Sequence, residues 1–271
     1  MGAHVEVMDL VAQMKAAERA FVLATVVRTV SVTAAKAGAK AIIAPDGTIV
    51  AGWIGGGCAR GAVLKAAREA LADGEPRMVS VQPEDLLAEL GVRAGESRQG
   101  VRFAANFCPS QGTMDVFVEP VLPHPSLVIF GASPVALSLA AQARGLGYHV
   151  TLAAPAAERP ASVDADALVD GFILGELHQA KRFVVVSTQG KGDEAALREA
   201  AVTEAAYRAF VGSRRKWAVL REKLLTQGVA ESALDTFKAP AGLDLGAITP
   251  EEIAMSILAE ITRERRRGQR G

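Results

Sequence analysis

The sequence predicts an α/β protein in which an N-terminal mixed α/β domain, residues 1–121, precedes a Rossmann-like domain, residues 126–271, with a doubly wound parallel sheet. The length of 271 residues, half of them hydrophobic and 22% charged, suits one or two globular domains. Pro120, Pro123 and Pro125 bracket a stretch without periodicity, which is typical of a linker. Strands and helices alternate after that linker, as they do in parallel sheets.

In the first domain, apolar residues recur at helical spacing near the start, and the turn sequence Pro45-Asp46-Gly47 predicts a hairpin. Three glycines then lead into an alanine-rich helix. The elements predicted, in order, are a helix over 5–20, strands over 21–27, 39–44 and 48–52, a helix over 59–71, and a mostly stranded region over 76–121, clearest at 114–121.

In the second domain, the strongest boundary signal is Thr249-Pro250-Glu251-Glu252, which combines an N-cap, a proline at the first helical position and a capping box. It predicts a last helix over 250–266. The elements predicted before it are strands over 127–130, 148–152, 182–187 and 208–211, and helices over 135–144, 193–201 and 213–227.

Composition excludes several classes of function. Thirty Lys and Arg balance thirty Asp and Glu, and aromatic residues make up 5%, which disfavours binding to nucleic acid or to an anionic membrane. No stretch has the roughly 18 apolar residues of a membrane span, so we expect a soluble, cytoplasmic protein. Two cysteines in a chain of this size predict reduced thiols and no disulfide scaffold.

The most specific local signal is the turn Gly55-Gly56-Gly57-Cys58, followed by Arg60. Glycines let backbone amides approach a ligand closely, and a helix N-terminus beside an arginine favours the thiolate form of a cysteine. We therefore predict that the three glycines bind a cofactor and that Cys58 is a nucleophile or a ligand for a soft metal. A cysteine packed in a structural glycine turn is the alternative.

The second thiol, Cys108, lies in another loop of the same domain, just ahead of a predicted strand. Two loop cysteines of one domain can meet in space, so Cys108 is predicted as a partner of Cys58. No histidine or acidic cluster accompanies them, and the spacing therefore does not predict a tetrahedral zinc site.

A strand that runs into Gly131-Ala132-Ser133-Pro134 is the context of a dinucleotide-binding fingerprint. Ser133 stands where the second glycine belongs, and Pro134 removes one amide donor. The next strand ends at Ala154-Pro155 without the acid that binds a ribose. Ordinary NAD binding is thus disfavoured, and Gly131, Ala132 and Ser133 are predicted to bind a different ligand or to serve packing alone.

Three cations open a predicted helix at Ser213-Arg214-Arg215-Lys216. Each costs about 0.3–1 kcal/mol against the helix dipole at low salt. A bound anion would offset that cost, so Ser213, Arg214 and Arg215 are predicted to contact a phosphate. A solvated basic turn or an interface patch is the alternative.

Taken together, these motifs resemble the XdhC/CoxI family over nearly the whole chain. The segment 27–40 is most similar to the carbon monoxide dehydrogenase accessory type, which is CoxF-like. Family members often carry a second glycine where Ser133 stands and Gly-Gly where Pro109-Ser110 follows Cys108. The motifs that carry the resemblance are 29–38, Gly55–Cys58, the Cys108 loop with 115–120, Gly212–Lys216, Gly242–Gly246 and Thr249–Ala254.

The resemblance implies a maturation factor, a chaperone and no enzyme, that binds the molybdenum cofactor as molybdopterin or its cytosine dinucleotide form. It would deliver this cofactor to an apo-molybdenum hydroxylase such as carbon monoxide dehydrogenase or xanthine dehydrogenase, with Cys58 near the molybdenum. A cofactor-synthesising or sulfurating enzyme and a second copy of the chain are further candidate partners. The rival hypotheses are an NAD(P)-dependent oxidoreductase and a dithiol redox protein that uses Cys58 and Cys108.

Overall fold

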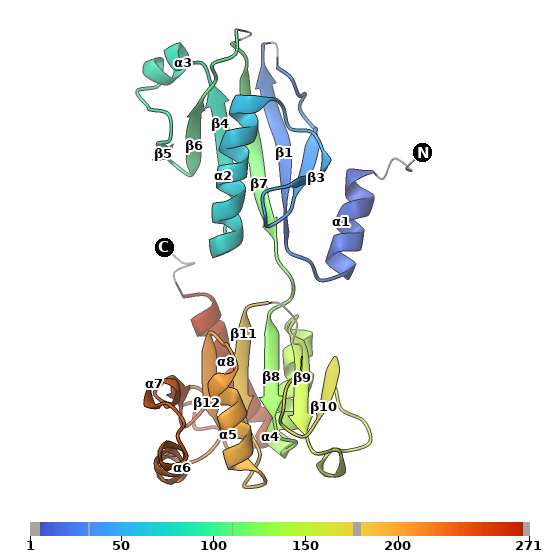
Figure 1. Ribbon diagram of the computed structural model, residues 1–271, viewed down its shortest axis with the longest axis vertical. Coiled ribbons are helices and arrows are strands. Elements are labelled where there is room, and N and C mark those ends of the chain that lie inside the picture. Colours follow the sequence, from blue (N-terminus) through green and yellow to red (C-terminus); the bar gives the residue numbers. More distant parts are fainter. Residues whose placement is uncertain (1–5, 32, 110, 176–179, 268–271) are drawn as a thin grey trace. The chain divides into compact units, whose positions relative to one another are not determined.

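The computed structural model describes residues 6–31, 33–109, 111–175 and 180–267. The chain divides into two compact units, Met1–Pro123 and His124–Gly271, and each has its own sheet (Figure 1). Within the described residues, no helix combines the length and the apolarity that crossing a bilayer requires.

A seven-stranded mixed sheet with the order β3-β2-β1-β7-β4-β6-β5 forms the N-terminal unit. Strands β4 and β6 are parallel, and the other neighbours are antiparallel. The hairpin predicted at the turn 45–47 is β2–β3. The strands are β1 (Phe21–Val30), β2 (Lys40–Ile43), β3 (Ile49–Gly52), β4 (Arg77–Gln82), β5 (Ser97–Arg98), β6 (Val101–Ala105) and β7 (Thr113–Val121).

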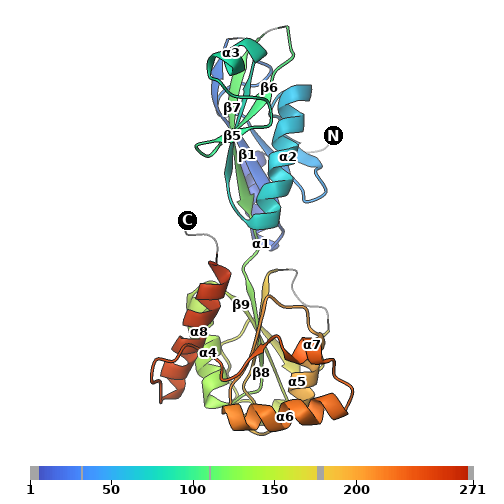
Figure 2. The same cartoon turned by 90° about the vertical axis from the view of Figure 1, so that its left-hand side faces the viewer.

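Helix α2 (Gly57–Asp73) covers one face of this sheet (Figure 2). Helix α1 (Val7–Ala16) packs on the other face. The alternation of β1 explains this, because Val22 and Ala24 belong to the α2 core while Phe21 belongs to the α1 cluster. The buried positions of α2 are nearly all alanine, which lets the helix lie close to the strands. Helix α2 is thereby held with its first turn at one end of the sheet.

Several predicted boundaries in this unit are wrong. The first helix ends at Ala16 because Glu18 takes a left-handed conformation with φ +51°. The first strand, predicted over 21–27, is longer than expected, since β1 continues to Val30. Pro120 lies in β7, as the strand predicted over 114–121 requires, and it is tolerated there because the β4 ladder stops at Val118 and leaves the β4 side of β7 unpaired.

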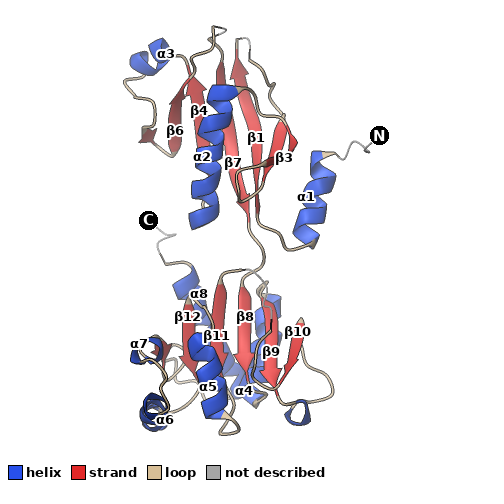
Figure 3. Ribbon diagram, in the orientation of Figure 1, coloured by secondary structure: helices blue, strands red, loops and turns tan. Residues whose placement is uncertain are grey.

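The C-terminal unit holds a six-stranded sheet with the order β10-β9-β8-β11-β12-β13 (Figure 3). Every pairing among its described strands is parallel, and numbering these strands 1 to 6 gives the Rossmann order 3-2-1-4-5-6. The strands are β8 (Ser126–Phe130), β9 (His149–Ala154), β10 (Ala167–Asp170), β11 (Arg182–Val186), β12 (Tyr207–Phe210) and β13 (Phe237–Lys238).

Helices cover both faces of this sheet, which makes it doubly wound as predicted. Helices α4 (Pro134–Gly145) and α8 (Pro250–Arg265) pack on one face. Helices α5 (Asp193–Val202), α6 (Arg214–Thr226) and the short α7 (Glu231–Leu234) pack on the other. The capping box predicted at Thr249 and Glu252 is formed.

A buried carboxylate anchors α8 to the sheet. Glu260 accepts hydrogen bonds from the Tyr207 hydroxyl at 2.7 Å and from the Gly242 N–H at 3.0 Å. Burial, together with the hydrogen bond to Glu260, raises the pKa of Tyr207 far above its ordinary value, so that the hydroxyl stays a donor.

The sequence patterns miss several short elements. These are α3 (Glu84–Glu89), which interrupts the region expected to be stranded, together with β5, β10, α7, β13 and a 3₁₀ turn at Ala156–Glu158. Each is six residues or shorter. Such lengths are too short to establish a period, so tertiary packing defines these elements.

Candidate functional site

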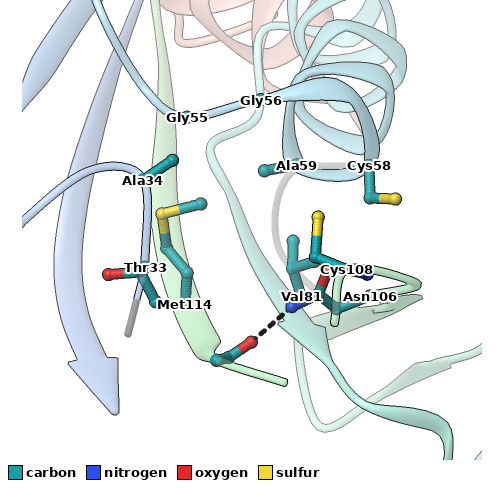
Figure 4. Close-up of a pocket in the computed structure, with 11 residues that line it drawn as sticks. Thr33, Ala34, Gly55, Gly56, Cys58, Ala59, Val81, Asn106, Cys108 and Met114 are labelled. Carbon is teal, nitrogen blue, oxygen red and sulfur yellow. Dashed lines mark hydrogen bonds between the residues drawn. The ribbon is translucent and has the colours of Figure 1, made fainter. Parts of the chain in front are cut away.

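The two cysteines line one cavity of about 90 Å³ in the N-terminal unit (Figure 4). Gly55, Gly56 and Cys58 reach it from the start of α2, and Asn106 and Cys108 reach it from the loop between β6 and β7. Four of the five residues predicted for this site are therefore brought together. Gly57, the fifth, begins α2 and is exposed.

Cys58 lies one residue inside α2, which begins two residues earlier than predicted. Both cysteines are free thiols, Cys58 half-buried and Cys108 exposed. Gly56 is the N-cap of α2 and has no side chain with which to cap the helix. Backbone amides of the first turn, which normally need an acceptor, are thus available beside the thiols.

The glycines of this turn have different roles. Gly55 is buried with φ +110°, and a Cβ there would lie 3.1 Å from the Met114 Cε atom, so its role is structural. Gly56 has an ordinary φ of −86°, is exposed, and an added Cβ would meet nothing within 4 Å. A side chain at position 56 would therefore extend into open space at the cavity without straining the backbone.

Asn106 positions Cys108. Its amide nitrogen donates to the Gly112 carbonyl at 2.7 Å, and its side-chain oxygen accepts from the Cys108 N–H at 3.0 Å. One side chain thus braces both ends of the loop that presents the thiol. Sequence reasoning missed Asn106, although an asparagine two residues before the cysteine is the pattern of an Asx turn.

The donors of this cavity are soft. Two thiols and the thioether-bearing Met114 line it, and Figure 4 shows their sulfur atoms around one space. Sulfur ligands prefer soft metals and clusters over hard cations. Among the residues that the structure describes, no three His, Cys, Asp or Glu side chains gather as a metal site. Any metal held here would have to bring most of its own ligands.

In the C-terminal unit, Gly131 allows the turn after β8 to approach β11. Its φ is +106°, and an added Cβ would lie 2.4 Å from the Ser187 carbonyl oxygen. Ala132 is half-buried and packs against the core of the α4 face. Gly131 is thus required by the contact between the two strand ends, whatever the ligand.

Ser133 stands at the position of the second fingerprint glycine, and its side chain forms hydrogen bonds within the chain. Ser133 caps α4, its hydroxyl accepting from the Ala136 N–H at 3.2 Å and pairing with the Ser187 hydroxyl at 2.7 Å. Pro134, at the first helical position, has no N–H. Two of the groups that would hold a pyrophosphate at this turn are therefore already used or missing.

An acid does lie beside the end of β9, although the sequence places none there. Asp170, the last residue of β10, is in register with Ala154 and accepts a hydrogen bond from the Ala156 N–H at 2.7 Å. Sequence reasoning could not find it, because β10 is a four-residue strand that was not predicted.

At the start of α6, Ser213 caps the helix by accepting from the Lys216 N–H at 3.2 Å. The Lys216 ammonium lies 2.6 Å from the buried carboxylate of Asp193, which neutralises it. Arg214 and Arg215 are exposed and form no ion pair with any residue between 6 and 267 that the structure describes. Two of the three cations therefore remain available to an anion.

The fold and this site define a class: a two-unit α/β protein that joins a domain bearing a glycine turn and two thiols to a Rossmann domain. Residues 127–261 match the XdhC Rossmann domain, and residues 14–82 match the XdhC and CoxI family. The chain belongs to the XdhC and CoxI family.

Individual relatives agree with this membership. The uncharacterized protein YqeB of Escherichia coli (strain K12) is 30% identical over 231 residues, which are 82% of this chain and 40% of that protein. A probable xanthine dehydrogenase subunit from Bacillus subtilis (strain 168) is 30% identical over 166 residues, 57% of this chain and 47% of that protein. The chain thus spans less than half the length of these relatives.

Among solved structures, the crystal structure of a xanthine dehydrogenase from Bacillus halodurans is 20% identical to this chain. The superposition covers 98% of this chain and 97% of that one, with a TM-score of 0.45.

Proposed function

We propose that this protein binds the molybdenum cofactor and delivers it to an apo-molybdenum hydroxylase. The observation that carries the proposal is the cavity where Cys58, Cys108 and the uncapped first turn of α2 come together. Membership of the XdhC and CoxI family supports it, and so does the relative that is a probable xanthine dehydrogenase component. The finer assignments, namely the cytosine dinucleotide form and carbon monoxide dehydrogenase as recipient, belong to the same proposal.

The donors of the cavity fit the metal end of this cofactor. Thiols suit molybdenum that already carries sulfur ligands, and the free amides of α2 suit its negative charge. The cavity volume of about 90 Å³ is well below the roughly 300 Å³ at which ligand pockets begin, so the pterin would extend beyond it. Bound cofactor would supply the redox-active molybdenum, while Cys58, Cys108 and the Gly55–Gly57 turn would hold it.

A valine at Gly56 is the sharpest test of this site. Gly56→Val is expected to remove most of the bound molybdenum, because Gly56 lines the cavity and the new side chain would crowd a ligand at the first turn of α2 without straining the backbone. Protein purified from a host that makes the cofactor would be analysed for molybdenum and released pterin per chain.

Gly61→Val is the matched control, since Gly61 lies one turn further along α2, is exposed, and also has open space around its Cβ position. It should retain the wild-type molybdenum content. Equal molybdenum in Gly56→Val and Gly61→Val, with both proteins folded, would contradict the proposal.

Arg214 and Arg215 are expected to contact a phosphate group, because both are exposed cations at the positive end of a helix. Replacing both with Gln should weaken binding of a phosphate-bearing ligand and flatten its dependence on salt. Binding would be measured at two ionic strengths. Unchanged affinity at low salt would assign both side chains to the solvated surface.

A dithiol redox protein is the second candidate, favoured by the placement of both thiols on one cavity. Cofactor-free protein would be treated with oxidised glutathione and mapped by mass spectrometry. Rapid formation of a Cys58–Cys108 disulfide in protein that never retains molybdenum would favour this candidate over the first.

A further inference from the structure

A second cavity, of about 270 Å³, lies in the C-terminal unit where the strand order reverses between β8 and β11. This edge, beyond the carboxyl ends of parallel strands, is where open α/β sheets bind ligands. Ser133 and Ser187 line it from the two strand ends, Val211 from the end of β12, and Ile253 from the first turn of α8. The cavity is distinct from the thiol-lined one, which lies in the other unit.

Among the residues that the structure describes, the two serines have no acceptor for one of their hydroxyl protons. Ser133 and Ser187 are 8% and 2% exposed, and their hydroxyls bond to each other at 2.7 Å. The Ser133 oxygen also accepts from the Ala136 N–H. Two hydroxyls carry two protons, and their mutual bond uses one of them, whichever serine is the donor. A buried donor on the cavity wall therefore calls for an acceptor supplied from the cavity.

The other walls of the cavity disfavour a charged ligand. No side chain among the described residues that line the cavity is charged, and the walls around Val135, Val211 and Ile253 are apolar. Pro134 has no N–H, and the Ser133 hydroxyl already caps α4, so a phosphate would lack the donors that this turn usually provides. Gln189 adds an amide that can both donate and accept.

The volume of the cavity limits the size of the ligand. A volume of 270 Å³ lies just under the roughly 300–1,000 Å³ of pockets for drug-sized ligands, so one ring system fits and a dinucleotide does not. A flat ring would place its faces on the apolar walls and a carbonyl oxygen on the serine pair.

We propose that this cavity binds an uncharged, bicyclic heterocycle with an amide-type edge, the chemistry shared by a pterin and a guanine base. The choice of a pterin as one source rests on the proposed function, whereas the cavity itself does not. The serine pair would donate to the ring carbonyl, and Gln189 would contact the edge at the rim.

The test measures binding of metal-free pterin, guanosine, GMP and NAD to the purified full-length chain by calorimetry. Pterin, guanosine or both should bind, and the phosphate of GMP should give no gain over guanosine. Pterin alone would identify a pterin as the source, and guanosine alone a guanine base. No binding of either ring at roughly 1 mM, or GMP or NAD binding tenfold tighter than guanosine, would overturn the proposal.

Two variants locate the site. The double variant Ser133→Ala/Ser187→Ala should weaken ring binding about tenfold, because it removes both hydroxyl protons of the serine pair. Val211→Trp should abolish it by filling the cavity, whereas Val219→Trp, on the exposed side of α6, should bind as the wild type does. Unchanged binding in Val211→Trp would overturn the assignment.

The ring-binding proposal and the proposed function can fail independently of one another. Ring binding without molybdenum retention would refute the function and keep this site. Molybdenum retention that survives in Val211→Trp, in a protein that binds no free ring, would refute this site and keep the function.

Discussion

Cys58→Ser is expected to lose cofactor retention and to fail in supporting maturation of the recipient enzyme. Serine keeps the size of the side chain but replaces a soft sulfur with a hard oxygen at the first turn of α2. The loss should be roughly tenfold or more, because even groups that only support metal ligands change metal affinity by about 10–100-fold. Molybdenum per chain and activity of the co-expressed hydroxylase would be measured.

Cys108→Ser is the companion variant and should show a smaller loss, since Cys108 is exposed on a loop whereas Cys58 is half-buried. Both variants should unfold at the wild-type temperature, because neither thiol is bonded within the chain. A normal cofactor load in folded Cys58→Ser would refute the central role of this thiol.

Gly131→Ala is expected to destabilise the C-terminal unit by about 3 kcal/mol or more. The new methyl would lie 2.4 Å from the Ser187 carbonyl oxygen, and a φ of +106° adds strain of about 1–3 kcal/mol. Because domains are stable by only about 5–15 kcal/mol, much of the unit's stability would be lost.

The measurement can be confined to this unit. Each unit holds one tryptophan, Trp53 or Trp217, and Trp217 packs against Phe210 and Phe237. Urea unfolding followed by fluorescence in a Trp53→Phe background would report on Trp217 alone. Gly145→Ala, at the other end of α4, has open space around it and should be neutral or slightly stabilising. Similar midpoints for the two glycine variants would show that the turn can relax.

The Rossmann-like, doubly wound parallel sheet could be predicted because its central strands are continuous apolar runs that alternate with helical patterns. Strands β8 and β11 are of this kind, and fully buried strands leave such runs in the sequence. The mixed sheet was predicted only in outline. Its strands are half-buried, and their register depends on partners such as β7, which pairs with both β1 and β4.

The candidate site was predicted from glycines and cysteines, because the backbone freedom of glycine and the reactivity of a thiol follow from the residue type alone. That Cys58 and Cys108 line one cavity follows from the sheet order, which places α2 and the loop between β6 and β7 at the same end. Asn106, Met114 and Asp170 were missed, since each acts through a neighbour that only the folded chain supplies.

The buried hydrophobic clusters of the chain are each drawn from a single unit. By thermodynamic linkage, a ligand that binds to one unit raises the stability of that unit, so the stability of each unit reports whether its ligand is bound. A ligand on α2 raises the stability of the N-terminal unit by RT ln(1 + [L]/Kd), which is about 2.7 kcal/mol at a hundredfold excess over Kd. A ligand between β8 and β11 does the same for the C-terminal unit. Because Trp53 lies in the N-terminal unit and Trp217 in the C-terminal unit, the unfolding signal of each tryptophan would report on a ligand bound to its own unit.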